Sequence, residues 1–520
     1  MVPSTIDRMA LVVVAFTSLT VLTVGLVYGT RCACGADSYG YVSEAVLWTK
    51  GTLHVPEPMI SRVPWTFADW TFTPLGYRPA MSRDAIVPTY PPGFPLTMAL
   101  AIVVGRTPSA AFVVVPILGA AAIWLTFLIG KRLDDSLTAT CGAVLTACSP
   151  IFLYQLIQPM SDVPVVTWWL AALLFLLLET DTAALLAGLA ASAAVLTRPN
   201  LVPLAVVCTV FAACPGERPA PAAARLRRGL LFATGALPGP LLIAWFQKAL
   251  YGSPLVSGYG RLSDLYALEN AGPNTHRYAA WLFESHGIAP FVGLAAPLIL
   301  MADAHTLAPG VRRAAWLSLA FSSTVYLAYL FYAPFDNWTY TRFLLPAVPL
   351  LLLLSIWVTS IALRRIGPTV ARLLVTAAVA LVALTWLRGQ RGLAQVRQGE
   401  QRYVRIAKYI RATVPDDALI LSMQHSGTVR YYAGRKTVRY DWLLPNWLDP
   451  AIEEMRRIRR APLVLLENWE EKQFRERFNG QAWGALDWPA KVEFDGARLY
   501  DPFDRERYLA HEAVITSRVR

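Results

Sequence analysis

The stretch "CGADSYGYVSEAVLW", residues 34–48, carries two acidic side chains among tyrosines. Asp37 and Glu44 are seven residues apart, a spacing that returns to almost the same face of a helix, and Tyr41 lies on that side between them. Removal of a proton from an alcohol requires an accessible, ionised carboxylate, and an acid at a helix start keeps a low pKa. We therefore interpret Asp37 as a candidate general base, with Glu44 and Tyr41 as candidate substrate contacts.

A structural role explains the same residues. A short helix over 38–50, closed by Gly51, predicts Asp37 at the N-cap, where its carboxylate would accept hydrogen bonds from free backbone N–H groups. The cap role and the base role do not exclude each other. For Glu44 the plainer alternative is a solvated residue on the helix surface.

The chain that must position these residues is strongly apolar. Of its 520 residues, 55% are hydrophobic and 16% are charged, and its mean hydropathy is +0.42. This composition excludes an ordinary soluble domain and predicts an α-helical polytopic membrane protein. The formal net charge of +12 comes from Lys and Arg dispersed over short loops and a polar C-terminal third, which indicates orientation in the membrane and no nucleic-acid partner.

A window of spanning length predicts about eleven transmembrane helices. They lie near 9–29, 109–130, 136–157, 163–178, 183–197, 200–214, 229–250, 287–302, 312–333, 341–363 and 370–387. The first is long and lacks a small-x-small cleavage site, so we expect it to be retained. The run at 93–105 has the length of an interfacial or re-entrant segment.

Loop charge predicts the orientation of these helices. If 93–105 does not cross, Arg8 and the basic loops "KRLDD", "RLRR", "VRR" and "RRIG" all lie on one side. The positive-inside rule then places the N-terminus in the cytoplasm, and the odd number of spans places the C-terminal third outside. The loop 30–108 and the polar clusters at 158, 197, 251–286 and 335 also lie outside.

Two arginines sit at the outer ends of predicted spans, where this charge bias disfavours cations. They are Arg198 in "TRPN" and Arg342 in "YTRFLLP", and each needs a partner. A lipid-linked phosphate fits, because a guanidinium pairs bidentately with phosphate and stabilises the charge that a departing phosphate gains. The alternatives are snorkelling to the interface or an ion pair with Asp336 or Asp162.

The remaining candidates are weaker. Tyr90 in "TYPPGF" precedes two prolines that stiffen the approach to 93–105, and its ring can stack on a sugar, line a cavity or anchor the interface. The six histidines show no zinc spacing. The six cysteines form no metal group, and Cys32 and Cys34 are too close in sequence for an easy mutual disulfide, so we expect no disulfide framework.

The polar C-terminal part alternates in pattern. "QRYVRIAKYIRATVP" and "DPAIEEMRRIRR" predict helices, whereas "ALILSMQ", "KTVRYDW" and "APLVLLENW" predict strands. We therefore expect two units: a transmembrane domain over 1–388 that contains the outer loop, and a small extracytoplasmic α/β domain over 389–520. The α/β domain has no P-loop and no GxGxxG, so nothing indicates a nucleotide.

Several motifs, in order along the chain, resemble a known group. "ADSYGYVSEAVLW", "TYPPGFPLTMALA", "GKRLDD", "SPIFLYQLIQPMSDVPVV", "LTRPNLVPLA" and "WTYTRFLLPAVPLLLLL" resemble the bacterial GT-C membrane glycosyltransferases. The most similar group is that of the protein-mannosyltransferases and aminoarabinose transferases (glycosyltransferase family 39-like). The resemblance covers about residues 5 to 365 and rests on order and spacing.

The resemblance implies a catalytic transmembrane domain with the GT-C fold. It also implies transfer of a sugar from a polyprenyl-phosphate donor, on the outer face of the membrane, with inversion at the anomeric carbon. Asp37 matches the family's base, although Ser38 stands where many relatives carry a second acid. The family's second acidic position matches Asp162 of "QPMSDVP", which a cap at the start of a helix, supplied by Ser161 or Asp162, also explains. Where Asp37 and Asp162 face each other they can hold a divalent metal, whose identity two carboxylates do not define.

The expected function is therefore a glycosyltransferase of the bacterial plasma membrane that uses Asp37 as base and binds the donor phosphate with Arg198 and Arg342. The acceptor, a lipid, glycan or protein, is not defined by the sequence. A transporter or flippase of a lipid-linked sugar is the alternative. Transporters often show inverted repeats and ionisable groups at mid-membrane, and neither pattern is visible in this sequence. A noncatalytic sugar-lipid binding protein with the same fold is a third possibility.

Overall fold

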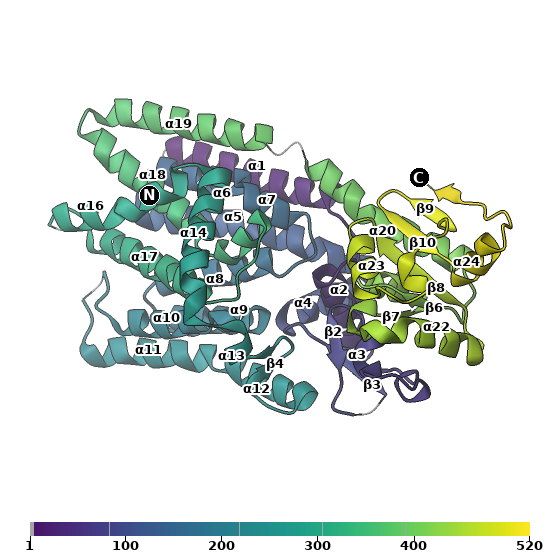
Figure 1. Ribbon diagram of the computed structural model, residues 1–520. Coiled ribbons are helices and arrows are strands. Elements are labelled where there is room, and N and C mark those ends of the chain that lie inside the picture. Colours follow the sequence, from purple (N-terminus) through teal and green to yellow (C-terminus); the bar gives the residue numbers. More distant parts are fainter. Residues whose placement is uncertain (1–4, 83, 218, 304, 390–391, 520) are drawn as a thin grey trace.

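The computed structural model describes residues 5–519 except 83, 218, 304, 390 and 391. A bundle of helices forms one end of the molecule and an α/β domain the other, with the elements of the outer loop between them (Figure 1). The predicted fold class, an α-helical polytopic membrane protein with a small C-terminal α/β domain, is confirmed.

Most of the helical part follows the predicted spans, but α14 (Ala271–His286) lies in 251–286, which was predicted as a segment outside the membrane. The helical part contains α1 (Thr5–Tyr28), α5 (Val114–Leu133), α6 (Ser136–Cys148), α7 (Pro150–Leu156), α8 (Asp162–Leu176), α9 (Asp181–Thr197), α10 (Pro203–Ala213), α11 (Ala222–Ala236), α12 (Pro238–Tyr251), α14, α15 (Ala289–Val292), α16 (Ala296–Ala302), α17 (Pro309–Leu330), α18 (Val348–Arg364) and α19 (Pro368–Gly389). A short connection after α12 holds β4 (Val256–Ser257), β5 (Gly260–Arg261) and α13 (Leu262–Leu265).

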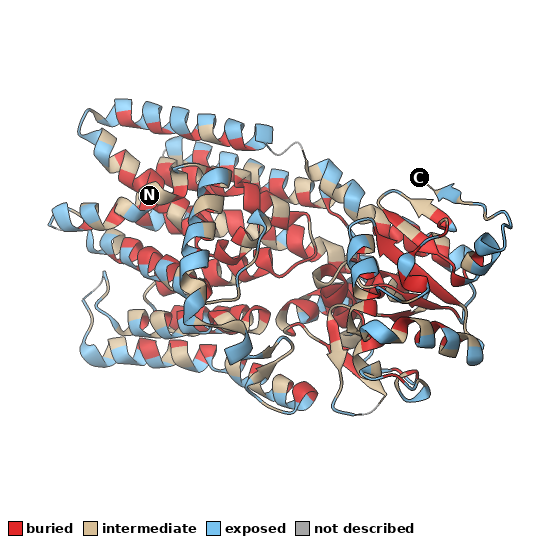
Figure 2. Ribbon diagram, in the orientation of Figure 1, coloured by how far each residue is buried: buried red, intermediate tan, exposed pale blue. Residues whose placement is uncertain are grey.

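Length and composition qualify some of these helices to cross a membrane. Among the described residues, four helices are long and apolar enough, and the number rises to seven if each of three bent pairs is one span. Four shorter apolar helices have 10–17 residues. The outward faces of α1 and α19 expose large apolar side chains such as Phe16 and Leu373, as lipid contact requires (Figure 2). The number of eleven spans stays a prediction.

Three sharp breaks interrupt the helices: two lie inside the predicted spans 136–157 and 341–363, and the third lies at the start of the predicted span 287–302. The break between α6 and α7 bends the chain by 59°, the one between α14 and α15 by 113°, and the one before α18 by 79°. Pro150 begins α7 and Pro346 lies in the break before α18, and a proline removes a helix hydrogen bond and clashes with the preceding turn. The break before α15 instead has Gly287 in a left-handed conformation, with φ of 63°. The predicted span 287–302 is not one helix, because Pro290, Gly293 and Pro297 divide it into α15, a 3-10 turn and α16.

The outer loop is well structured. It contains α2 (Asp37–Thr49), β1 (Val55–Pro56), α3 (Ala68–Thr71), β2 (Tyr77–Pro79), β3 (Ala85–Pro88) and α4 (Gly93–Gly105). The three strands form a small sheet in the order β1-β3-β2. Helix α4 has the bounds of the segment predicted as interfacial or re-entrant, and it packs mainly against α2 and the 3-10 turn Pro108–Val113, and less against α9.

The C-terminal domain holds a sheet of six strands. Its elements are α20 (Leu393–Thr413), β6 (Leu419–Leu421), α21 (Ser426–Thr428), β7 (Lys436–Val438), α22 (Leu448–Arg457), β8 (Pro462–Glu467), α23 (Glu470–Arg477), β9 (Val492–Phe494), β10 (Ala497–Tyr500), α24 (Pro502–Leu509) and β11 (Ser517–Val519). The strand order is β11-β9-β10-β8-β6-β7, with β6 parallel to both β7 and β8. All five elements predicted after residue 389 are present, whereas β9, β10 and β11 were not predicted.

The outer loop and the C-terminal domain share one hydrophobic core. Met59, Trp65 and Phe72 of the loop are buried together with apolar residues of the C-terminal domain. Two ion pairs cross the same boundary: Arg430 and Lys436 each donate to the buried carboxylate of Glu57 at 2.6 Å. Tertiary contacts therefore hold the loop that carries Asp37 from the side opposite the bundle.

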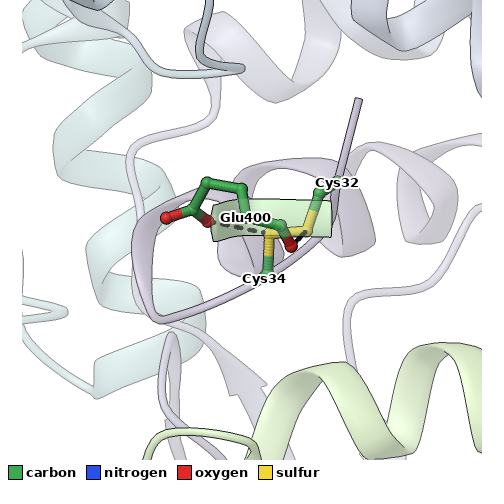
Figure 3. Close-up of side chains that lie close together, drawn as sticks. All are labelled: Cys32, Cys34 and Glu400. Carbon is green, nitrogen blue, oxygen red and sulfur yellow. Dashed lines mark hydrogen bonds between the residues drawn. A yellow bond between two sulfur atoms is a disulfide. The ribbon is translucent and has the colours of Figure 1, made fainter. Parts of the chain in front are cut away.

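Cys32 and Cys34 form a disulfide, with Cα atoms 5.4 Å apart. The expectation that they would not pair is wrong, because the tight loop after Arg31, whose backbone is left-handed with φ of 45°, brings the Cα atoms within bridging distance. Glu400 of α20 lies against the two sulfurs (Figure 3). The bridge therefore sits where the start of the outer loop meets the C-terminal domain.

Candidate active site

Asp37 is the first residue of α2, and its carboxylate is held by side chains from other segments. Ala36 occupies the cap position, and α2 has no side-chain cap. Instead, the Tyr90 hydroxyl donates to Oδ1 at 2.6 Å, and the Arg342 guanidinium donates to Oδ2 at 2.9 Å. The predicted N-cap role of Asp37 is therefore wrong, because side chains from two distant segments take both oxygens.

These two partners set the charge of Asp37. Burial by itself would raise the pKa of Asp37, but the positive charge of Arg342 and the hydrogen bond from Tyr90 outweigh it and hold the pKa below its ordinary value. Burial and the nearby carboxylate raise the pKa of the Tyr90 hydroxyl well above its ordinary value. At neutral pH, Asp37 is therefore an ionised acceptor and Tyr90 a protonated donor.

A glycine allows Tyr90 to reach Asp37. A Cβ atom at Gly40, in the first turn of α2, would lie 2.1 Å from Cε2 of Tyr90. The ring also packs against Tyr41, with centroids 4.4 Å apart. Because only 3% of Tyr90 is exposed, its stacking on a sugar stays a prediction, and its hydrogen bond to Asp37 is the role that the structure defines.

Asp162 and Arg198 form a second, deeper ion pair. Asp162 is the first residue of α8 and is 1% exposed, and the Arg198 guanidinium donates to its Oδ1 at 2.5 Å. Helix α8 has no side-chain cap, so the predicted capping by Ser161 or Asp162 is wrong. Arg198 also donates to Ser161 Oγ at 3.3 Å, and Tyr41 shares a hydrogen bond of 2.9 Å with the same hydroxyl. This network links α2, α8 and the end of α9.

Arg342 lies between the two acids. Its Nη1 atom is 2.9 Å from Asp37 Oδ2 and 3.9 Å from Asp162 Oδ2. Asp162 Oδ2 is buried and accepts no hydrogen bond among the described residues. A divalent metal shared by Asp37 and Asp162 would have to displace this guanidinium, so the acid pair as it stands does not fit a metal, and that role stays a prediction.

Another group of metal-type ligands lies outside the acid pair. Cys32, Cys34 and Glu400 are the one cluster of three or more such side chains among the residues that the structure describes. The bond between the two sulfurs consumes the thiolates that a metal would need. The geometry therefore defines no metal centre in either place.

A cavity of about 1010 Å³ opens beside Asp37. The predicted site residues Asp37, Tyr41, Tyr90, Arg198 and Arg342 all line it. Residues of α12, of the connection 254–266 and of the segment 328–343 complete its wall. Segments separated by about 300 residues in sequence thus meet around one space.

Glu44 does not line this cavity. It is fully buried, and its Oε1 accepts a hydrogen bond of 3.2 Å from Trp48 of the same helix. A spacing of seven keeps it on the side of Asp37, but about 10 Å further along the axis of α2. Burial raises the pKa of Glu44 well above its ordinary value, opposite in direction to the shift of the Asp37 pKa.

Sequence reasoning missed several residues of the site. Tyr259 lines the cavity and packs edge-on against Tyr90, with centroids 5.8 Å apart. Tyr329 lies within 3.4 Å of Arg198 through its hydroxyl, and Phe343 stacks on its ring. These aromatics lie in loops and at helix ends without a local pattern, and only the order of motifs along the chain pointed to this region.

Residues 89–231 match the model of the family described as dolichyl-phosphate-mannose-protein mannosyltransferase. No curated protein matches the chain. The fold is similar to that of ArnT from Cupriavidus metallidurans bound to undecaprenyl phosphate, with a TM-score of 0.56 and 12% identity over 93% of this chain and 97% of ArnT.

The fold is also similar to that of an archaeal enzyme. The oligosaccharyltransferase AglB from Archaeoglobus fulgidus, in complex with an inhibitory peptide and a dolichol-phosphate, gives a TM-score of 0.54 and 13% identity over 93% of this chain and 72% of AglB. The complex of the Archaeoglobus fulgidus oligosaccharyltransferase with Zn and sulfate gives 0.51 and 11% over 89% and 69%. Together, the family-model match and the shared fold confirm the resemblance to the GT-C membrane glycosyltransferases, and the chain has the GT-C fold.

Proposed function

We propose that this chain is a glycosyltransferase that moves a sugar from a polyprenyl-phosphate donor to a hydroxyl of an acceptor. The observation that carries the proposal is an ionised Asp37 on the wall of a cavity that two arginines also line. The ArnT and AglB structures, by their descriptions, hold undecaprenyl phosphate and a dolichol-phosphate, which supports a lipid-linked donor here.

The reaction is a single displacement with inversion. Asp37 takes the proton of the acceptor hydroxyl while the acceptor oxygen bonds to the anomeric carbon. The bond from that carbon to the phosphate oxygen breaks, and the polyprenyl phosphate leaves with one further negative charge. The reaction occurs on the outer face of a bacterial plasma membrane, with the N-terminus in the cytoplasm and the domain 389–520 outside.

Arg342 and Arg198 stabilise the negative charge that develops on the departing phosphate. Both guanidiniums are fixed by carboxylates and by aromatic rings, Arg342 over Tyr340 at 5.2 Å and Arg198 over Phe343 at 5.6 Å. A preorganised cation in a low-dielectric site stabilises developing charge without reorganisation at the moment of reaction. Arg342 also keeps Asp37 ionised, so one side chain serves both the base and the leaving group.

A genetic experiment with lipid analysis tests the proposal. Envelope glycans and lipid-linked sugars are measured by mass spectrometry in cells lacking the gene, in cells with it restored, and in cells carrying Asp37→Asn. We expect deletion and Asp37→Asn to remove the same sugar from an envelope product while its polyprenyl-phosphate form accumulates in the outer leaflet. Asp336→Asn is the matched control, because its carboxylate is 88% exposed and pairs with Arg277 outside the cavity wall.

Two outcomes would contradict the proposal. Turnover of Asp37→Asn within a few-fold of wild type would remove the base assignment. Accumulation of the lipid-linked sugar on the cytoplasmic leaflet alone would favour the transporter or flippase.

A further inference from the structure

The wall of the cavity carries very few charges. Among the described residues that line it, the carboxylate, guanidinium, ammonium and imidazole groups amount to Asp37, Arg198 and Arg342. The remaining polar side chains are hydroxyls and the neutral amides Asn200 and Gln247. The cavity is therefore an aromatic and apolar space with one acid and two cations.

The one acid on the wall is already engaged. Both oxygens of Asp37 accept hydrogen bonds, and in the proposed reaction this carboxylate also takes the acceptor proton. Asp162 lies behind the wall at 1% exposure and is paired with Arg198. No described carboxylate on the wall is left to neutralise a positive charge on a bound sugar.

The two cations are engaged as well. In the proposed function, Arg198 and Arg342 bind the donor phosphate and stabilise it as it leaves. A sugar with its own carboxylate would compete with that phosphate for the same guanidiniums. A sugar with an ammonium group would bury a charge in a site of low dielectric beside two other cations, which costs far more than burying a hydroxyl.

Neutral sugars fit the same wall well. Four of the tyrosines that line the cavity come from segments after α12, namely Tyr259, Tyr266, Tyr332 and Tyr340. A tyrosine offers an apolar ring face and one hydroxyl that donates or accepts. Such groups match the apolar faces and the hydroxyl rim of an uncharged pyranose or furanose.

We propose that the donor carries a neutral sugar, with neither an amino nor a carboxylate group. This inference rests on the proposed function and narrows its substrate class. The sequence resembles both mannosyl and aminoarabinosyl transferases, and the charges on the cavity wall favour an uncharged sugar over the amino sugar.

The test measures donor binding, which needs no knowledge of the acceptor. The purified full chain in nanodiscs is loaded with radiolabelled undecaprenyl phosphate, and unlabelled donors compete for it at pH 7. The donors are undecaprenyl-phosphate arabinose and its 4-amino-4-deoxy analogue, which differ by a hydroxyl against an ammonium, and undecaprenyl-phosphate mannose. We expect the amino donor to bind about tenfold or more weakly than its hydroxyl partner.

A variant with one added carboxylate tests the cause. Asn200→Asp places an acid on the wall without changing side-chain volume, and Gln247→Glu does the same from α12. Either variant should reduce the difference in binding affinity between the amino donor and the hydroxyl donor. If Asn200→Asp does not fold, Gln247→Glu provides the same test.

The outcomes separate the two proposals. Equal or tighter binding of the amino donor to the wild-type chain would overturn the neutral-sugar inference and leave the transferase proposal standing. Failure of undecaprenyl phosphate and of every donor to bind would overturn the proposed function itself.

Discussion

Tyr90→Phe tests how the site keeps Asp37 ionised. The hydroxyl donates to Asp37 Oδ1 at 2.6 Å and lowers the pKa of that carboxyl. A hydrogen bond to a charged group contributes about 1.5–3 kcal/mol, and one pKa unit corresponds to about 1.36 kcal/mol. Loss of the hydroxyl should therefore raise the pKa of Asp37 by about one to two units.

The sign of the effect on activity follows from the role of a base. Asp37 acts when ionised, so activity is present above its pKa and is lost as pH falls through it. A raised pKa moves the acid limb of the profile of kcat/KM against pH toward higher pH by the same one to two units. The deficit of the variant relative to wild type should therefore grow as the pH falls.

The assay follows release of polyprenyl phosphate from a labelled donor, with membranes of cells lacking the gene as the source of acceptor. Tyr41→Phe is the matched control, because its hydroxyl bonds to Ser161 rather than to Asp37. This control can change the rate, but its acid limb should stay in place. An unshifted acid limb in Tyr90→Phe, or an equal shift in both variants, would refute the reasoning.

Three further variants probe the packing of the site. Gly40→Ala should lower kcat/KM about 100-fold, because its Cβ would lie 2.1 Å from the ring of Tyr90, which orients Asp37. The control Gly399→Ala, whose Cβ would have no atom within 4 Å, should have a kcat/KM near that of wild type. Equal values of kcat/KM for the two variants would contradict this reasoning. Arg198→Gln should lower stability by about 3–5 kcal/mol, because it leaves Asp162 buried without its cation; thermal unfolding in detergent measures this loss, and adding Asp162→Asn should recover part of it. Glu57→Gln tests the contact between the outer loop and the C-terminal domain. The pKa of Glu57 is lowered, against burial, by two cations, so its contribution to stability is present above the unfolded value of about 4.3 and is lost as pH falls through the folded value. The difference in Tm between wild type and Glu57→Gln should therefore shrink below pH 4, and a constant difference would contradict the linkage.

Much of the architecture could be read from periodicity and composition. Apolar runs of spanning length predicted the helices of the bundle other than α14, and alternation of patterns after residue 389 predicted five elements that the structure contains. The positions at which the helices break were harder to predict. The 113° bend between α14 and α15 falls at Gly287, whose φ is 63°, and it follows from local backbone chemistry that a hydropathy window averages out.

The candidate residues were chosen by type and position, but their partners were not. Asp37 and Asp162 both look like helix caps in the sequence, and both instead pair with arginines from other segments. Glu44 shares the helix side of Asp37 and yet is buried away from the cavity. A helix pattern predicts a direction around the axis, and it does not predict which neighbour lies in that direction.

The sequence by itself therefore determined the membrane class, the positions of the helices, the α/β character of the last third and the segments that carry the acids and arginines. These properties depend on local hydropathy and on short-range periodicity. Only the tertiary structure decided that Tyr90 and Arg342 hold Asp37, that Arg198 neutralises Asp162, and that the loop of Asp37 shares a core with the C-terminal domain. Those contacts join residues up to about 400 positions apart, and their energy depends on burial and on the charge of the partner, which no local pattern encodes.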